Sequence, residues 1–167
     1  LIENEFGEIG IDGGFLKDSG IEITEMNSGC ICCSLVGDFA TNLNEVITKY
    51  HPDRILIESS GVGKLSDVVK AVEAVGETVN SSVTVVDGQK CNMYMKNFGE
   101  FYNNQVETAE TIILSRTDSV PQAKLDAAVA LLREHNADAA LVTTPWHELT
   151  GAQLLDAMCG NASVKKD

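Results

Sequence analysis

The sequence has few basic residues and no long apolar runs, and these two shortages exclude several classes of protein. Its 167 residues include 12 Lys and Arg against 25 Asp and Glu, a formal net charge of −13. A nucleic-acid-binding surface needs clustered Lys and Arg, so we expect no nucleic-acid partner. No apolar run reaches the roughly 20 residues of a membrane-spanning helix, so we expect no membrane partner. The acidity suits a protein that attracts cations, although a solvated acidic surface explains it equally well.

The cysteines do not form the pattern of a secreted disulfide framework. Their number, five, is odd, and three of them are crowded together. No basic segment followed by an apolar core marks a signal peptide. We therefore expect a reducing, cytoplasmic setting. The chain also lacks internal repeats, and its length fits a single domain over residues 1–167.

The most informative stretch is the run from Cys30 to Cys33, which reads Cys-Ile-Cys-Cys. Thiolates are soft ligands that suit zinc, cobalt, nickel or copper(I). An extended backbone would put the side chains of Cys30 and Cys32 on one face, and Cys33 joins them only if the chain bends. A tetrahedral site needs further ligands from elsewhere in the fold. The alternative is that these are small buried apolar side chains. Three cysteines so close together favour metal binding.

Apolar segments alternate with helical patterns along the chain. Strands are expected at the first residues of the chain and at 21–26, 54–58, 82–87, 111–115 and 139–143. Helices are expected from a cap at Asp38 to about 51, near 65–72, at 91–110 with a break at 97–99, at 121–136 and at 149–158. This alternation predicts an α/β fold of three layers, α/β/α, around a largely parallel sheet.

Polar residues follow three of the expected strands, where ligands bind in parallel sheets. These residues are Glu58, Asp87 and the stretch from Ser115 to Asp118. Each acidic residue alone is weak evidence, because an Asp or Glu at the end of a strand is often only a helix cap.

Glu58 and Gly61 together fit a phosphate-transfer site. An acid at the end of an apolar strand can hold a water-coordinated Mg²⁺, as the Walker-B acid does. A glycine three residues later lets its backbone N–H approach a terminal phosphate. A simple turn before a helix explains the pair equally well. The following Gly61-Val62-Gly63-Lys64-Leu65 is not a phosphate loop, because Leu65 stands where Ser or Thr must ligate Mg²⁺.

Asp118 is a candidate for recognition of a purine base. A carboxylate there could accept both N1–H and N2–H₂ of guanine, which discriminates against adenine. The alternative is that Asp118 caps the helix that begins near Pro121. We favour base recognition because Ser115-Arg116-Thr117-Asp118 directly follows an expected strand.

Three stretches, in order and spacing, resemble the CobW-like metallochaperone GTPases, a branch of the P-loop GTPases. Residues 2–8, Ile-Glu-Asn-Glu-Phe-Gly-Glu, are similar to that family's first switch loop. Residues 29–33, Gly-Cys-Ile-Cys-Cys, match its metal motif. Residues 57–61, Ile-Glu-Ser-Ser-Gly, are similar to its Walker-B acid and second switch.

The resemblance implies a metal-gated switch that couples GTP binding and hydrolysis to delivery of Zn²⁺ or Co²⁺ to a client metalloprotein or a cobalamin-related pathway. Glu58 would position Mg²⁺ and water, and Gly61 would sense the γ-phosphate. The metal ligands that it implies are Cys30, Cys32, Cys33 and Glu3. The further nucleotide-binding residues that it implies are Glu5, Ser115, Arg116 and Asp118. A homodimer is included among the expected assemblies.

The chain departs from the family pattern at two places. The family's first strand, GxxxxGK[ST] loop and first helix have no counterpart in this sequence, and Ser115 and Arg116 stand where the family has Asn and Lys. We therefore expect these 167 residues alone to hydrolyse GTP negligibly. One alternative is a non-catalytic metal-binding or scaffold protein. Another is a nickel-insertion GTPase of the hydrogenase or urease type, which ranks lower because no His lies near Cys30–Cys33. The sequence upstream of Leu1 would decide the enzyme class.

Overall fold

The computed structural model describes residues 2–3, 24–25, 35–59, 61 and 63–159. Its internal contacts divide the chain into two compact units, residues 1–78 and 79–167. We call them unit 1 and unit 2.

Unit 1 contains three short parallel strands in the order β2-β1-β3 and two helices that pack on each other. Its elements are β1 (Ile2–Glu3), β2 (Thr24–Glu25), α2 (Leu35–Tyr50), β3 (Ile57–Glu58) and α3 (Leu65–Ala74). Phe39 and Leu43, one helical turn apart on α2, are buried, as are Val68 and Val72 on α3. These apolar residues at a spacing of four form the core of the unit.

Two expectations for α2 have different outcomes. The helix already includes Leu35, so the prediction that Asp38 caps it is wrong, and Asp38 lies inside its first turns. Acidic residues are favourable both at the cap and in the first turn, so the sequence does not separate the two positions. The expected end near His51 is confirmed. The residue before a proline is disfavoured in the helical region, and His51, before Pro52, has φ 45°.

The expected strand at 54–58 is shorter than predicted, because only Ile57–Glu58 pairs in the sheet. Of the strand expected at 21–26, Thr24–Glu25 is described and is a strand.

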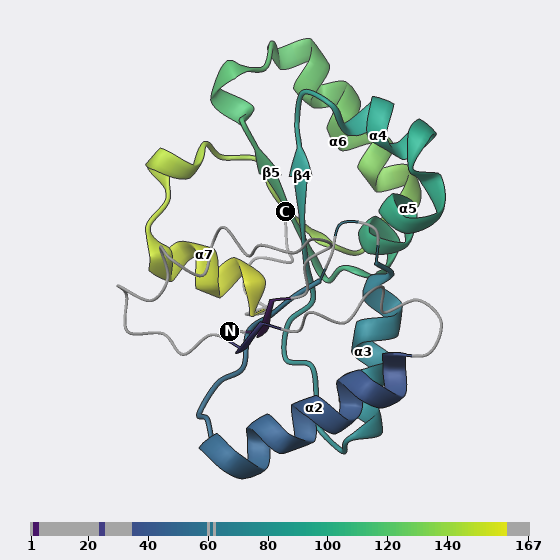
Figure 1. Ribbon diagram of the computed structural model, residues 1–167. Helices are drawn as coiled ribbons and strands as arrows, with labels where there is room; N and C mark the ends of the chain where they lie inside the picture. Colours follow the sequence, from purple (N-terminus) through teal and green to yellow (C-terminus); the bar gives the residue numbers. More distant parts are fainter. Residues whose placement is uncertain (1, 4–23, 26–34, 60, 62, 160–167) are drawn as a thin grey trace. The chain divides into compact units, whose positions relative to one another are not determined.

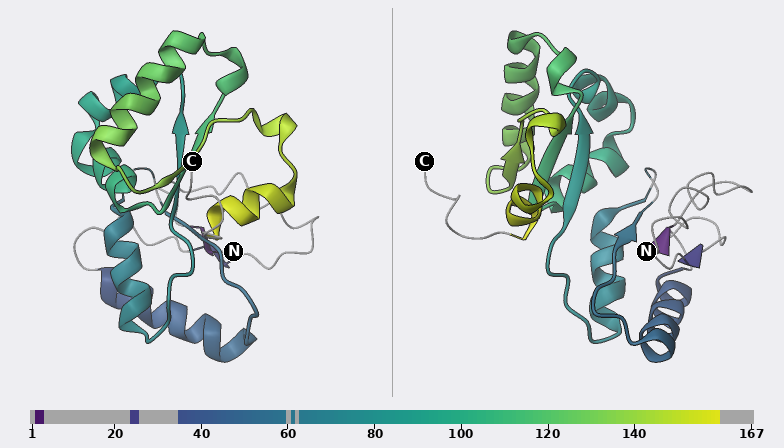
Figure 2. Two further views of the ribbon diagram at one scale, coloured as in Figure 1. Left: turned by 180° about the vertical axis from the view of Figure 1, so that it is seen from behind. Right: turned by 90° about the vertical axis from the view of Figure 1, so that its left-hand side faces the viewer.

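Unit 2 is a parallel sheet in the order β4-β5-β6 with helices on both faces. Its elements are β4 (Val83–Asp87), α4 (Cys91–Asn97), α5 (Gly99–Thr108), β5 (Thr111–Ser115), η1 (Thr117–Ser119), α6 (Gln122–His135), β6 (Ala140–Val142), η2 (Trp146–Glu148) and α7 (Gly151–Met158). Figures 1 and 2 show α7 on one side of the sheet and α4, α5 and α6 on the other. The predicted α/β class with parallel strands is confirmed.

The central strand β5 is covered on both faces, which explains its continuous apolar sequence. Ile112 and Leu114 are fully buried and belong to the same core as Val106 of α5 and Leu132 of α6. The expected break in the helical stretch 91–110 is confirmed at Phe98, between α4 and α5.

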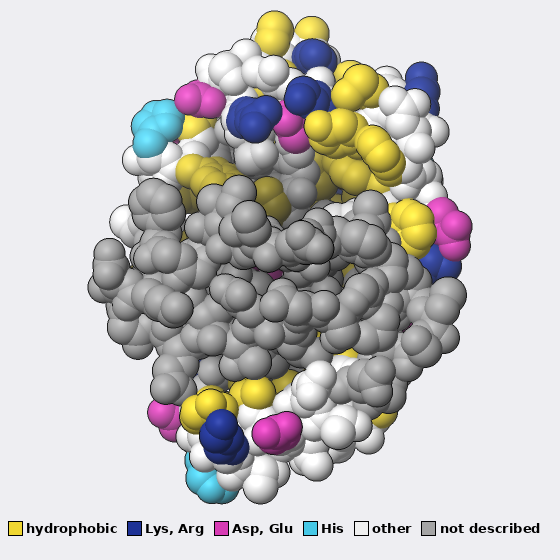
Figure 3. Space-filling model, in the orientation of Figure 1, with side chains coloured by type: hydrophobic (Ala, Val, Ile, Leu, Met, Phe, Trp, Pro, Cys, Tyr) yellow, Lys and Arg dark blue, Asp and Glu magenta, His cyan; other side chains and the backbone are white. Residues whose placement is uncertain are grey.

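The surface of unit 2 carries exposed apolar side chains over α4 and α5, seen as yellow atoms in Figure 3. Met93 of α4 and Phe98, which directly follows this helix, are about half exposed. None of the helices described here combines the length and apolar character needed to cross a membrane.

Candidate functional site

The carboxyl ends of β4 and β5 are aligned, which brings the loops that follow them side by side. Asp87, the last residue of β4, is in register with Ser115, the last residue of β5. The N–H of Gly88 donates to the carbonyl of Ser115 at 3.1 Å. A Cβ at position 88 would lie 3.2 Å from that same oxygen. A glycine at this position therefore lets the two loops approach closely.

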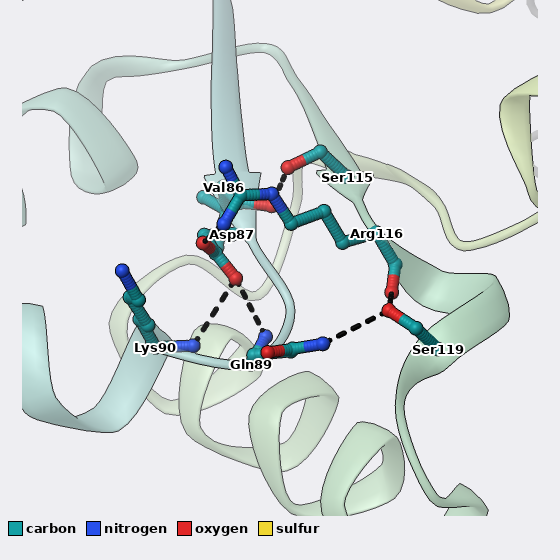
Figure 4. Close-up of polar contacts among 7 residues, drawn as sticks. All are labelled: Val86, Asp87, Gln89, Lys90, Ser115, Arg116 and Ser119. Carbon is teal, nitrogen blue, oxygen red and sulfur yellow. Dashed lines mark hydrogen bonds and ion pairs between the residues drawn. The ribbon is translucent and has the colours of Figure 1, made fainter.

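The Asp87 carboxylate holds both loops together (Figure 4). Its Oδ1 accepts the backbone N–H of Gln89 at 2.8 Å and of Lys90 at 3.3 Å. Its Oδ2 accepts Nη1 of Arg116 at 2.9 Å. The Asp87 side chain is only 14% exposed, whereas that of Arg116 is 60% exposed. A pair this open to solvent adds at most about 1 kcal/mol to stability, so its main effect is on the geometry of the loops.

Arg116 has a strained backbone that its neighbours stabilise. Its φ of 60° and ψ of 25° are left-handed, which costs a non-glycine residue about 1–2 kcal/mol. Its carbonyl accepts the backbone N–H of Ser119 at 3.2 Å and the Ser119 hydroxyl at 3.0 Å. Nε2 of Gln89 in turn donates to Oγ of Ser119 at 2.9 Å. We call Asp87, Gln89, Arg116 and Ser119 the loop clamp.

Asp118 lies between the two clamped residues of this loop. It is in the short 3₁₀ helix η1, its side chain is exposed, and it forms no hydrogen bond or ion pair with the residues that the structure describes. The alternative that it caps α6 is wrong, because Pro121 occupies the cap position and no side-chain hydrogen bond caps that helix. The Asp118 carboxylate is therefore free of described protein partners and open to a ligand.

Ser115 and Arg116, the other two predicted base-contacting residues, already have protein partners. Oγ of Ser115 donates to the carbonyl of Val86 at 3.3 Å, and Arg116 pairs with Asp87. Arg116 nevertheless remains largely exposed, so its guanidinium and alkyl stem are accessible to a planar ring.

Three glutamates stand in one row across the sheet of unit 1. Glu3 at the end of β1 is in register with Glu25 of β2 on one side and with Glu58 of β3 on the other. Glu3, which is predicted to bind the transition metal, and Glu58, which is predicted to hold Mg²⁺, are thus neighbours in the sheet.

Gly61 follows β3 and is exposed. A Cβ built at this position would meet no atom within 4 Å. The described residues therefore leave the place of a side chain at this position open, and the predicted role beside a phosphate stays a prediction. Glu58 is likewise exposed, and it lies in unit 1, whereas Asp118 lies in unit 2.

The cysteine run and Glu5 lie outside the described residues, so their predicted roles stay predictions. Within the described part of the chain, no three His, Cys, Asp or Glu residues are grouped closely enough to hold a metal ion. The two described cysteines, Cys91 and Cys159, are both free thiols.

Parallel strands with acidic residues at their carboxyl ends define an α/β domain of the nucleotide-binding type. Residues 1–143 match the CobW/HypB/UreG nucleotide-binding domain, and the chain belongs to this family. Its fold is accordingly the P-loop NTPase-like α/β fold of that domain.

Several proteins of known name are similar to this chain. The zinc chaperone YeiR of Escherichia coli (strain K12) is 28% identical over 160 residues, which is 93% of this chain and 48% of that protein. The zinc chaperone CobW of Sinorhizobium sp is 30% identical over 159 residues, 76% of this chain and 45% of that protein. The zinc-regulated GTPase metalloprotein activator 1 of Dictyostelium discoideum is 23% identical over 205 residues, 93% of this chain and 42% of that protein.

The chain thus spans about half the length of the curated relatives it matches. No solved structure matches it significantly.

The sequence alone did not reveal the whole loop clamp. Asp87 was visible as an acid at the end of a strand, but its partner was not. Gln89 and Ser119 lie 30 positions apart and form no recognisable motif. Their contact depends on the alignment of β4 with β5, which no local pattern reveals.

Proposed function

We propose that this chain is the nucleotide-binding domain of a metallochaperone that couples GTP binding and hydrolysis to delivery of zinc to a client metalloprotein. The observation that carries the proposal is a Cys-x-Cys-Cys run within a domain of the CobW/HypB/UreG family. The names of the similar proteins, two zinc chaperones and a zinc-regulated GTPase metalloprotein activator, support zinc as the cargo. Cobalt, passed towards a cobalamin-related pathway, is the alternative cargo, because thiolates accept both ions.

The nucleotide would be recognised by Asp118, with Ser115 and Arg116 beside the base and Glu5 near the phosphates. The exposed Asp118 carboxylate can accept two hydrogen bonds from the edge of guanine, whereas adenine has an unprotonated N1 and no 2-amino group. The exposed guanidinium of Arg116 can stack on the purine. These features support GTP rather than ATP.

The phosphate end of the nucleotide would lie at Glu58 and Gly61. An exposed carboxylate at the end of a strand fits the oxygen ligands that Mg²⁺ prefers, usually through retained water molecules. When bound, Mg²⁺ would neutralise the negative charge that develops on the phosphates. Glu58 would orient the ion and a water molecule, and Gly61 would leave room for the terminal phosphate.

The cargo would bind to Cys30, Cys32 and Cys33, with Glu3 as an oxygen ligand from the end of β1. Because β1 and β3 are neighbouring strands, Glu3 is directly beside Glu58 in the sheet. A structural change at the phosphate end can therefore reach the cargo site through two neighbouring strands. Delivery requires that the two nucleotide states bind the metal with different affinities. We propose that residues 1–167 act as one domain in the cytoplasm, with a homodimer as a candidate assembly.

Nucleotide competition tests this function on the full natural chain, with any segment that precedes Leu1 included. GTP should bind more tightly than ATP by tens-fold, because a carboxylate that the bound base covers and leaves unmatched costs roughly 1–3 kcal/mol or more. Asp118→Asn should shift the preference towards XTP, since xanthine carries an oxygen where guanine carries an amine. Equal binding of GTP and ATP that Asp118→Asn does not alter would contradict the proposal.

A further inference from the structure

We propose that Asp87 is a positioning residue for guanine selectivity, acting through the loop clamp to hold Asp118 where it can accept both N–H groups of the guanine edge. The inference rests on the proposed nucleotide site and adds to it a residue that does not touch the base. It concerns how the base-reading carboxylate is held.

The clamp fixes the chain on both sides of Asp118. Before it, Arg116 is tied to Oδ2 of Asp87 at 2.9 Å. After it, Ser119 receives a hydrogen bond from Gln89 at 2.9 Å. The first tie comes from the last residue of β4 and the second from the loop that follows it, as Figure 4 shows. The backbone is therefore restrained at two points while the Asp118 carboxylate itself has no partner among the described residues.

The backbone strain at Arg116 requires an explanation of this kind. Among the described residues, the non-glycine positions with positive φ are His51 and Arg116. His51 directly follows the last residue of α2, where a left-handed residue commonly ends a helix. Arg116 ends no helix, and its left-handed backbone is held by hydrogen bonds from Ser119 and by the pair with Asp87. Strain that is held in place by surrounding contacts is typical of functional loops.

Guanine selectivity depends on fine placement of that carboxylate. Hydrogen bonds weaken steeply when their distance or angle departs from the ideal, and two bonds to one edge must be satisfied together. A loop free to leave the left-handed conformation would move Asp118 and lose part of this pairing. The contacts proposed at Glu58 and Gly61 involve no clamp residue, so loss of the tie from Asp87 should reduce selectivity more than overall affinity.

Two variants release the clamp without removing a residue of the core. Asp87→Asn keeps the size of the side chain and an oxygen for the N–H groups of Gln89 and Lys90, but removes the charge that holds Arg116. Arg116→Met keeps the alkyl stem of a side chain that is 60% exposed, so it leaves the fold intact. The matched control is Glu107→Gln, which breaks the pair with His135, 3.1 Å apart, in the same unit and outside the clamp.

The test compares the dissociation constants of GDP and IDP for each variant of the full natural chain. IDP keeps the N1–H but lacks the 2-amino group. The dissociation constant of IDP divided by that of GDP therefore reports the second hydrogen bond to Asp118. The unaltered protein should bind GDP about tenfold more tightly than IDP. Asp87→Asn and Arg116→Met should each bring the ratio several-fold closer to one, and the double variant no further, because both act on one pair. Glu107→Gln should leave the ratio unchanged.

The outcomes separate this inference from the proposed function. A ratio above one that both clamp variants leave unchanged, even if GDP and IDP both bind less well, overturns the role of Asp87 and leaves the GTP site standing. An unaltered protein that binds neither nucleotide, or binds them equally, overturns both proposals. Circular dichroism of each variant identifies any loss of fold, and the exposed Arg116→Met variant decides the question if Asp87→Asn unfolds.

Discussion

Trp146 donates its indole N–H to the main-chain carbonyl of Leu114 at 3.1 Å. The bond joins η2, the 3₁₀ helix after β6, to the penultimate residue of β5. Trp146 is nevertheless 54% exposed, so its ring lies open beside the end of the strand that leads to Asp118. The segment after β6 is thus bonded to β5, and the loop after β4 is bonded to the loop that follows β5.

This position makes Trp146 a reporter of nucleotide binding. It is the single tryptophan of these 167 residues, so the part of the fluorescence change that Trp146→Phe removes comes from this site. Binding of GDP at the end of β5 should cover the ring and move its emission to shorter wavelength. A titration of the full natural chain followed by fluorescence measures the shift. Trp146→Phe should remove the signal, while an emission unchanged at saturating GDP would place the base away from this loop.

The cysteine run should bind about one transition-metal ion. With Co²⁺ as a spectroscopic probe, thiolate ligands give a charge-transfer absorption band. The double variant Cys32→Ser, Cys33→Ser should lose this band, because only one thiol of the run remains. Cys159→Ser, which removes an exposed cysteine outside the run, should keep it. A band that survives in the double variant would show that the site is elsewhere.

Asn136 should contribute strongly to the stability of unit 2. Its Nδ2 donates to the carbonyls of Val106 and Ala109, both at 2.8 Å, and its Oδ1 accepts the N–H of Ala139 at 2.9 Å. It therefore satisfies backbone groups at the end of α5 and before β6. Asn136→Ala leaves these groups without partners and should lower the free energy of unfolding by about 2–3 kcal/mol. Urea denaturation measures this, and Asn92→Ala, an exposed control on α4, should change it by less than about 0.5 kcal/mol.

The buried thiol of Cys91 should make stability depend on alkaline pH. Burial raises the pKa of this thiol above its ordinary value of 9.0, and the charge of Asp87 acts in the same direction, while the hydroxyl of Tyr102 opposes them. The unfolded chain therefore releases a proton that the native protein keeps. The contribution of the protonated Cys91 thiol to the free energy of unfolding is fully present below about pH 9 and is lost as the pH rises through the native pKa.

The comparison of wild type with Cys91→Ala isolates this effect. Urea denaturation under reducing conditions at pH 7 and pH 10 should show a larger loss of stability for the wild type than for the variant. The half-buried Tyr102 has a pKa that is raised by burial and also by Cys91, so the difference between the two proteins includes this coupled effect of Cys91 on Tyr102. An equal loss in the two proteins would mean that Cys91 titrates normally.

The sequence by itself determined the class of the fold and the order of its elements. Apolar residues at helical spacing, such as Phe39 and Leu43, and continuous apolar strands such as Thr111–Ser115 express local geometry, and local geometry is set by neighbours in the chain. The same holds for the break at Phe98 and the end of α2 before Pro52. The cysteine run and Glu58-Ser59-Ser60-Gly61 could likewise be recognised as short patterns, and through them the family.

Only the tertiary structure decided which residues meet at the ends of the strands. The register of β4 with β5 aligns Asp87 with Ser115, and this alignment brings Asp87 within reach of Arg116 and Gln89 within reach of Ser119, pairs that are 29 and 30 positions apart. The tertiary structure also showed that Asp118 does not cap α6 and that Glu3 lies beside Glu58 in the sheet of unit 1. A local pattern specifies that a strand forms but not which strand it joins or in what register, because that choice depends on the packing of the whole sheet.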